Sequence, residues 1–294
     1  MSINLRKPLL SLFAFATLFS CGGKAPVEKE ITIDGETYRV EAEELVIGME
    51  CNYSPFNWTA NRASEYTLPI STGGYADGYD IQIAKILSER MQMDVRIVKE
   101  QWESLIEDVN MGNTNLILAG MTDTEERRQS VLFSDEYYRS EVVLLVKKDV
   151  AERYEGKTLS KEELSNLLKG QLVVSQKDTV EDDIIDNFVK DYGCVHVPGQ
   201  STYGLAAKDV ENKSAFALTV ELPVANAYVS SMSEVGIIHI DQSILGVDLS
   251  QLGVSIGIKK GNTGLQKAVN KVLSSISQEQ RDEMMNKAVE RSAE

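Results

Sequence analysis

The amino-acid sequence predicts an α/β protein with two lobes. Strand-like and helix-like segments alternate along the first half of the 294 residues, and the second half repeats that alternation. This length suits about two domains of roughly 100 to 200 residues each. Several strand-like runs are continuously apolar, as is typical of parallel strands that crossover helices cover on both faces. We therefore expect mainly parallel sheets joined by crossover helices.

The elements of the first half follow from turn residues and hydrophobic periodicity. Residues 31–40 predict two short strands joined at Asp34-Gly35, a strong hairpin signal. Buried apolar runs predict strands at 45–47, 95–98 and 116–121. Apolar residues at helical spacing predict helices over 79–91 and 102–111. The resulting order of strand, helix, strand, helix and strand indicates a parallel sheet.

The second half shows the same alternation. Strands are expected at 172–174, 195–197, 216–220, 236–240 and 254–258. Helices with one apolar face are expected over 180–189 and 265–276. This set of elements is sufficient for a second lobe.

Charge and histidine content exclude several classes of function. The chain has 30 basic and 45 acidic residues, so its formal charge is 30 − 45 = −15, and a nucleic-acid binder needs a basic surface that this composition does not offer. Its two histidines, His196 and His239, have no metal-ligand spacing, and a histidine-dependent catalytic triad has little to draw on. We expect no metal and no cofactor.

The amino terminus has the layout of a signal peptide. Arg6 and Lys7 precede an apolar run over 9–19, which is too short to span a membrane. Cys21 follows Ser20, and the run from 18 to 21 resembles a bacterial lipobox, so residues 1–20 would be removed and Cys21 would carry a lipid. The protein would then be held outside the cytoplasm, on a bacterial membrane, by its lipid anchor alone. The alternative is a conventional secretory signal with an incidental cysteine.

The segment over 21–43 combines a small, polar tether with the predicted hairpin. The two remaining cysteines, Cys51 and Cys194, each lie within an apolar run and fall in different predicted lobes. We expect two buried thiols, although a secreted protein also permits a disulfide.

Several stretches together carry a specific family resemblance. The clearest are GMECNYSPFNW (48–58), GYDIQIAKIL (78–87), WESLI (102–106), LAGMTDTEERR (118–128) and FSDEYYRSEVVLLVKK (133–148). Weaker ones follow at 173–182, 220–225 and 252–273. In this order the chain resembles the amino-acid-type extracellular solute-binding proteins, family 3, of bacterial ABC importers.

The resemblance implies a two-lobed periplasmic-binding-protein fold of the type II, Venus flytrap kind. Lobe 1 would comprise 44–138 and 250–294, and lobe 2 would comprise 139–249. The chain would cross between the lobes at Tyr137–Glu141 and Leu249–Leu252. The resemblance further implies a monomer that binds a free amino acid between its lobes and delivers it to ABC permease subunits.

One arginine is the expected carboxylate anchor. Thr124 can cap a helix and place Arg127 in its first turn, where a guanidinium offers a planar fork to a carboxylate. The resemblance assigns Arg127 to the ligand's α-carboxylate, and gives Gly120 and Thr122 backbone and hydroxyl contacts to the same zwitterion. A surface arginine paired with Glu125 or Glu126 is the alternative.

Lobe 2 would supply the opposite wall of the site. Thr179 opens a helix whose N–H groups could bind the carboxylate. The family usually has glycine just before this threonine, whereas this chain has Asp178, an acid close to the expected carboxylate. Glu221 matches the family's acid, usually aspartate, that binds the α-ammonium group.

The side-chain pocket would decide specificity. Tyr53, Phe56, Trp58 and Trp102 could form aromatic walls, with Phe56 the one most expected to belong to the core. In the family the position of Glu50 meets the distal polar group of the ligand. A carboxylate there favours a cationic or amide side chain and disfavours glutamate and aspartate.

Two other functions remain open from the sequence. The same fold could serve as a ligand-binding sensor module for a signalling receptor. A few relatives are dehydratases acting on cyclohexadienyl substrates, but a complete zwitterion site argues against an enzyme here.

Overall fold

The protein has two central β-sheets, one in each lobe. The computed structural model describes residues 28–249 and 252–293. The predicted signal peptide and Cys21 lie outside the described residues. The first sheet has the order β10-β17-β9-β3-β8. Its strands are β3 (Leu45–Met49), β8 (Val95–Lys99), β9 (Leu116–Ile117), β10 (Val131–Arg139) and β17 (Gly253–Lys259). We call the part of the molecule around this sheet lobe 1.

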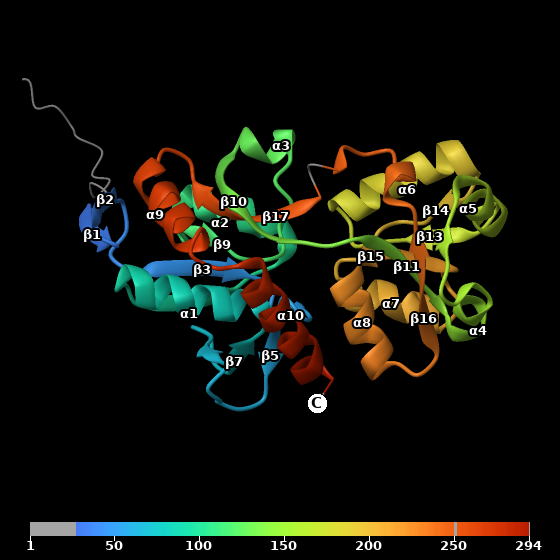
Figure 1. The fold of residues 1–294 in the computed structure, drawn as a ribbon, viewed down its shortest axis with the longest axis horizontal. Helices are drawn as coiled ribbons and strands as arrows, with labels where there is room; N and C mark the ends of the chain where they lie inside the picture. The colour runs from blue at the N-terminus through green and yellow to red at the C-terminus, as the bar shows by residue number, and fades with distance from the viewer. Residues whose placement is uncertain (1–27, 250–251, 294) are drawn as a thin grey trace, which may run out of the picture.

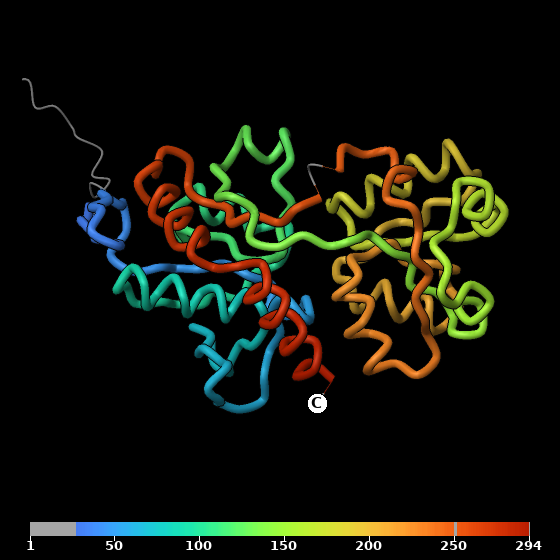
Figure 2. The backbone as a smooth tube through the Cα atoms, in the orientation of Figure 1, coloured from blue at the N-terminus to red at the C-terminus, as the bar shows by residue number. Residues whose placement is uncertain are grey.

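The second sheet has the order β12-β16-β11-β15-β13-β14 and forms the centre of lobe 2 (Figure 1). Its strands are β11 (Val142–Lys147), β12 (Thr158–Leu159), β13 (Leu172–Val174), β14 (Val195–His196), β15 (Ala217–Glu221) and β16 (Val235–Ile240). The chain passes from lobe 1 to lobe 2 between β10 and β11, and it returns before β17 (Figure 2).

Helices cover both sheets. Those of lobe 1 are α1 (Tyr79–Met91), η1 (Trp102–Ser104), α2 (Leu105–Met111), α3 (Glu125–Arg128), α9 (Thr263–Leu273) and α10 (Gln278–Ser292). Those of lobe 2 are α4 (Lys148–Ala151), η2 (Glu152–Tyr154), α5 (Lys161–Leu168), α6 (Val180–Tyr192), α7 (Tyr203–Glu211), α8 (Leu222–Ser231) and η3 (Gln242–Ile244). Helix α10 also packs against α8 of the opposite lobe.

Two small sheets complete lobe 1. The predicted hairpin is present as β1 (Lys29–Ile33) and β2 (Glu36–Val40), and both turn residues, Asp34 and Gly35, have positive φ, as this kind of turn requires. A four-stranded sheet contains β4 (Asn52–Tyr53), β5 (Asn57–Ala60), β6 (Leu68–Pro69) and β7 (Tyr75–Asp77).

Helix α6 begins at Val180, as predicted, and runs to Tyr192, three residues beyond the predicted end at 189. Thr179 caps its amino end by accepting from the backbone N–H of Asp182, and Gly193 ends it in the left-handed region. The side chains at 184, 185 and 188 are fully buried. This packing fixes the first turn of α6 at the boundary between the lobes.

The sheets are less uniformly parallel than predicted. β3 pairs in parallel with β8 and β9, whereas β17 is antiparallel to both β9 and β10. The apolar run over 116–121 forms a strand only at Leu116–Ile117, because the backbone turns at Gly120, where φ is +60°. Beyond this turn the chain meets β17 again, because Thr122 forms an isolated bridge with Val254.

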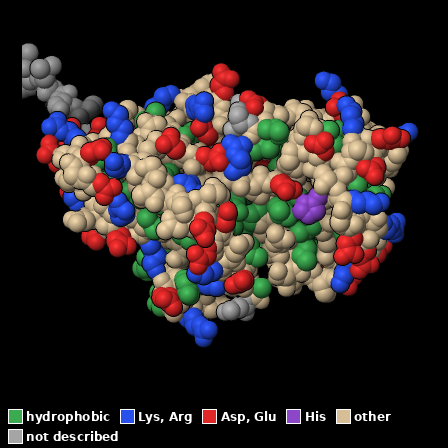
Figure 3. Space-filling model, in the orientation of Figure 1, with side chains coloured by type: hydrophobic (Ala, Val, Ile, Leu, Met, Phe, Trp, Pro, Cys, Tyr) green, Lys and Arg blue, Asp and Glu red, His purple; other side chains and the backbone are tan. Residues whose placement is uncertain are grey.

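The described cysteines and the surface charges are typical of a globular protein. Cys51 and Cys194 are both buried free thiols, as expected. On the face drawn in Figure 3, acidic and basic side chains are interspersed over both lobes. None of the helices in the described part of the chain is long and apolar enough to cross a membrane.

Candidate functional site

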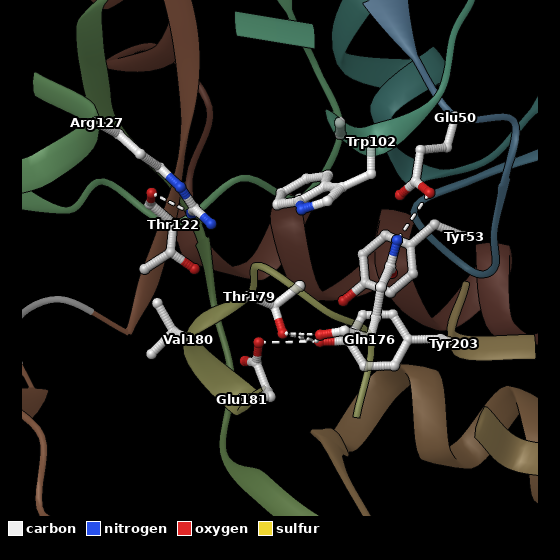
Figure 4. A pocket seen from close by; sticks show the side chains of 12 residues that line it. Glu50, Tyr53, Trp102, Thr122, Arg127, Gln176, Thr179, Val180, Glu181 and Tyr203 are labelled. Carbon is white, nitrogen blue, oxygen red and sulfur yellow. Dashed lines mark hydrogen bonds between the residues drawn. The ribbon is translucent and has the colours of Figure 1, made fainter. Parts of the chain in front are cut away.

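A small cavity lies between the lobes, at the ends of strands from both sheets (Figure 4). Lobe 1 lines it with Glu50, Tyr53, Trp102, Ala119, Gly120, Thr122 and Arg127. Lobe 2 lines it with Gln176, Thr179, Val180, Glu181 and Tyr203. The cavity volume is about 10 Å³, which is room for about one water molecule. The lobes are thus closed on each other in this structure.

Arg127 is held in the cavity wall by its helix and by two carbonyl groups. Thr124 caps α3 and accepts from the backbone N–H of Arg127 at 3.2 Å, as predicted. The guanidinium donates to the carbonyl of Thr122 and to that of Asp178, both at 2.9 Å. It also lies over the ring of Trp102, 5.2 Å from the ring centroid. Burial lowers the pKa of Arg127, and the charge of Glu181 opposes that shift.

Asp178 meets lobe 1 through its backbone and not through its carboxylate. Its φ of +61° is in the left-handed region, which glycine adopts most readily. The carbonyl accepts from Trp102 Nε1 at 3.2 Å in addition to Arg127. The residue is exposed, and it lines an outer hollow with Glu103 and Glu126 instead of the inner cavity. Its charge is therefore turned away from the expected carboxylate position.

Glu50 lies at the end of the cavity away from Arg127, with Trp102 between them in Figure 4. It follows β3 and is only 3% exposed. Its Oε1 accepts from Nε2 of Gln176, across the lobe boundary, at 3.0 Å. Burial raises the pKa of Glu50 to about 7, and the charge of Glu103 adds to this shift while the Gln176 bond opposes it. A cation placed next to this carboxyl would lower its pKa and favour the charged carboxylate.

Glu181 is a second buried acid in the cavity, and the sequence reasoning did not identify it. It is in the first turn of α6, is 6% exposed and accepts from the Tyr203 hydroxyl at 2.9 Å. Burial raises its pKa, while its own backbone N–H, Tyr203 and Arg127 oppose the shift. Glu181 could have been identified from the sequence because it follows the capping Thr179 by two residues, in the first turn of a helix whose amino end faces lobe 1.

Aromatic rings close the cavity on the side of lobe 1. Tyr53 stacks on Phe56 and, across the lobe boundary, on Tyr203, with ring centroids 5.1 Å apart in each pair. Gly120 is required beside Tyr53, because a Cβ there would lie 2.6 Å from Tyr53 Cε1. The Gly120 N–H donates to the Tyr137 hydroxyl at 3.1 Å, so this N–H already has a partner.

Three of the predicted binding residues are not among those that line the cavity. Phe56 is fully buried behind Tyr53, in agreement with its alternative place in the core. Trp58 is in β5, and its ring faces the guanidinium of Arg291 at 5.9 Å, so it packs against α10. Glu221 ends β15, where it pairs with Val142 of β11.

Glu221 has an unusual environment of its own. It is 6% exposed, and its Oε2 has no hydrogen-bond partner among the described residues. Burial raises its pKa to about 8. Within the described residues, no group of three or more histidine, cysteine or acidic side chains could hold a metal ion.

Comparison with known proteins identifies the family of this chain. The model of the bacterial extracellular solute-binding proteins, family 3, matches residues 45–290. The chain belongs to this family. The two-lobed α/β fold predicted from the sequence is confirmed.

Members of the family from several bacteria are similar to this chain. ABC transporter arginine-binding protein 1 of Escherichia coli is 22% identical over 80% of this chain and 86% of its own length. ABC transporter glutamine-binding protein GlnH of Bacillus subtilis is 26% identical over 95% of this chain and 94% of its own length.

Solved structures share the fold of this family-3 protein. The amino acid ABC transporter substrate-binding protein AbpA of Streptococcus pneumoniae, bound to L-arginine, has a TM-score of 0.69 at 20% identity, over 86% of this chain and 97% of that one. The ancestral amino acid-binding protein AncCDT-1, a precursor of cyclohexadienyl dehydratase, has a TM-score of 0.63 at 25% identity, over 86% of this chain and 96% of that one.

Proposed function

We propose that this protein captures an amino acid with a cationic or amide side chain outside the cytoplasm and delivers it to an ABC permease. The observation that carries the proposal is one interlobe cavity that combines the Arg127 guanidinium, two buried carboxylates and aromatic walls. Relatives named as arginine-binding and glutamine-binding proteins support an amino-acid ligand.

The α-carboxylate of the ligand would bind Arg127. Two of the five guanidinium N–H donors bond protein carbonyls, so donors remain for a carboxylate. Thr122 and Thr179 line the same cavity and can add hydroxyl contacts. The amino end of α6 favours an anion there through its N–H groups and its dipole.

The side chain of the ligand would extend between Trp102 and Tyr53 toward Glu50. A cation beside Glu50 would stabilise the charged carboxylate and lower its pKa from about 7. An acidic side chain would bring two like charges together in a desolvated site, which costs several kcal/mol. The cavity should therefore prefer arginine, lysine, histidine or glutamine to glutamate or aspartate.

Ligand entry requires the lobes to separate, because the closed cavity has room for about one water molecule. Opening would break the contacts that residues 176–178 make with lobe 1, including the ion pair of Lys177 with Glu103. The chain segment between β10 and β11 would act as one hinge. The second predicted crossing, at Leu249–Leu252, lies partly outside the described residues. We further propose that Cys21 carries the lipid that keeps the protein at the membrane.

A thermal-shift screen over the twenty amino acids tests the proposed specificity. Arginine, lysine, histidine or glutamine should give the largest rise in melting temperature, since tight binding to the folded state stabilises it. Glu50→Gln should reduce the response to cationic ligands most. Glu44→Gln is the matched control, because Glu44 lies outside the cavity, is only half-buried and pairs with Arg96. A largest response to glutamate or aspartate would show that Glu50 does not set the specificity.

A further inference from the structure

We propose that Asp80 is a positioning residue for the ligand site, because it fixes the two segments of lobe 1 that carry Glu50 and Gly120. This inference rests on the proposed function. Asp80 is not among the residues that line the cavity, so it would act through its neighbours and not by touching the ligand.

Asp80 is a fully buried acid at the start of α1, and each of its carboxylate oxygens accepts a hydrogen bond. Oδ1 accepts from the Tyr137 hydroxyl at 2.7 Å, and Oδ2 accepts from Asn57 Nδ2 at 2.8 Å. Both partners are fully buried as well. Burial raises the pKa of Asp80 to about 7, while these two bonds oppose the shift.

One of the two bonds leads to the Gly120 segment of the cavity wall. The Gly120 N–H donates to the Tyr137 hydroxyl at 3.1 Å, which leaves the hydroxyl proton for Asp80. Tyr137 is held in place by the Tyr79 hydroxyl, which donates to its backbone carbonyl at 2.8 Å. Because Gly120 has positive φ and lies beyond the end of β9, its N–H is held by a side chain and not by strand pairing.

The other bond leads to the Glu50 segment. Asn57 Oδ1 accepts from the backbone N–H of Cys51 at 2.8 Å. Cys51 directly follows Glu50 and has a φ of +53°, which is strained for a residue with a side chain. The bond from Asn57 therefore stabilises the turn between Glu50 and Tyr53, both of which line the cavity.

This arrangement explains why a carboxylate occupies position 80. The Tyr137 hydroxyl oxygen already accepts from Gly120, and the Asn57 oxygen is likewise taken by a backbone N–H. Both neighbours consequently present donors to position 80. Aspartate accepts on both of its oxygens, whereas asparagine has only one acceptor oxygen. No lysine or arginine of the described residues forms an ion pair with Asp80, so a neutral side chain would fill this space at lower cost if packing were its only role.

Isothermal titration calorimetry of Asp80→Asn with L-arginine tests the inference in the folded protein. The variant keeps the size of the side chain and loses one of the two bonds. Affinity should fall by about tenfold or more, because binding must then order a wall segment that the lost bond no longer holds.

Tyr137→Phe removes the hydroxyl that joins Asp80 to Gly120, so it should weaken arginine binding in the same sense. Tyr192→Phe is the matched control, because Tyr192 is also buried, lies in lobe 2 away from the cavity and donates its hydroxyl proton to the Ile244 carbonyl at 3.0 Å. This control should lose stability and still bind arginine within about threefold of wild type. Equal losses of affinity in the two tyrosine variants would contradict a positioning role.

Amide hydrogen exchange followed by NMR needs no ligand. In Asp80→Asn the N–H of Gly120 or of Cys51 should exchange about tenfold faster or more, relative to the N–H of Leu145 in the central strand β11 of lobe 2. Faster exchange with unchanged arginine affinity would make Asp80 a structural residue only, and weaker binding with unchanged exchange would show that it does not hold these segments. Either result overturns the inference. A wild type that binds none of the twenty amino acids would refute the proposed function, and the exchange rates would still decide whether Asp80 fixes the two segments.

Discussion

Gly120 shows how a single residue shapes the cavity wall. Its φ of +60° is strained for any residue with a side chain, and a Cβ would collide with Tyr53. Its N–H bonds the Tyr137 hydroxyl, which in turn donates to Asp80 at 2.7 Å. The glycine therefore permits both the turn after β9 and the stacking of Tyr53.

Gly120→Ala should lower the free energy of unfolding by about 2–4 kcal/mol, from backbone strain of about 1–2 kcal/mol plus displacement of Tyr53. Urea denaturation measures the change. Gly156→Ala is the control, because Gly156 has a similar φ of +70° and no atom within 4 Å of the added Cβ. Equal losses in the two variants would show that the contact with Tyr53 contributes nothing.

At the scale of residues, local signals predicted some of the site and missed the rest. The cap of Thr124 and the place of Arg127 follow from neighbouring residues in the sequence, so both could be predicted. Whether an acid reaches the cavity depends on how two lobes meet, which no local pattern encodes. For this reason Glu181 was missed and Glu221 was expected at the cavity.

Among the elements, the segment from Gln176 to Glu181 makes most of the contacts between the lobes at the site. It contributes the amide that bonds Glu50, the carbonyl of Asp178 that Trp102 and Arg127 share, and the first turn of α6. Because Trp102 and Arg127 bond the backbone carbonyl of Asp178, these two contacts do not depend on the side chain at position 178.

Asp178→Gly should leave ligand affinity within about threefold of wild type, because the carboxylate is directed away from the cavity. Asp178→Ala should lower the free energy of unfolding by about 1 kcal/mol relative to Asp178→Gly, because alanine is strained at positive φ. Calorimetry and urea denaturation give the two quantities. An affinity that rises about tenfold in Asp178→Gly would instead mean that Asp178 repels the ligand's carboxylate.

Helices and strands were predicted best where the apolar pattern and the flanking residues indicate the same element. The range predicted for α1 agrees with the structure, since its apolar face and flanking strands are clear. The run over 116–121 is apolar throughout, yet only Leu116–Ile117 form a regular strand, because the backbone turns at Gly120, where φ is positive. Helix α10 was not predicted, because only Met285 and Ala288 are fully buried along it and its pattern is largely polar.

At the scale of the whole molecule, four buried or partly buried carboxyls have pKa values raised to about 7 or 8. Burial is the largest cause in each: the pKa is about 7 for Glu50, Asp80 and Glu100 and about 8 for Glu221. The folded state thus binds more protons than the unfolded state between about pH 4 and pH 8.

The free energy of unfolding should therefore fall as the pH rises through this window, by about 2–5 kcal/mol between pH 5 and pH 8. Urea denaturation at a series of pH values measures the slope. Asp80→Asn should reduce the slope, because Asp80 is fully buried and its charged form is disfavoured by burial. A stability that rises from pH 5 to pH 8 would contradict these pKa shifts.

The two-lobed plan could be predicted because alternating strands and helices recur in both halves of the chain. The closed arrangement could not, since it depends on contacts between residues far apart in sequence, such as Tyr53 with Tyr203 and Glu50 with Gln176. These contacts bring the predicted carboxylate anchor and the predicted distal acid into one cavity.

The most direct test of the central claim is calorimetric titration of Arg127→Ala with the preferred amino acid. Removing one partner of a desolvated charge pair costs about 2–5 kcal/mol, so affinity should fall by about 30-fold to several thousand-fold while the fold is kept. Arg128→Ala is the matched control, because Arg128 is on the same short helix, exposed and paired with Asp123, and it should bind within about threefold of wild type. An Arg127→Ala protein that binds within about threefold of wild type would contradict the claim that this arginine anchors the ligand between the lobes.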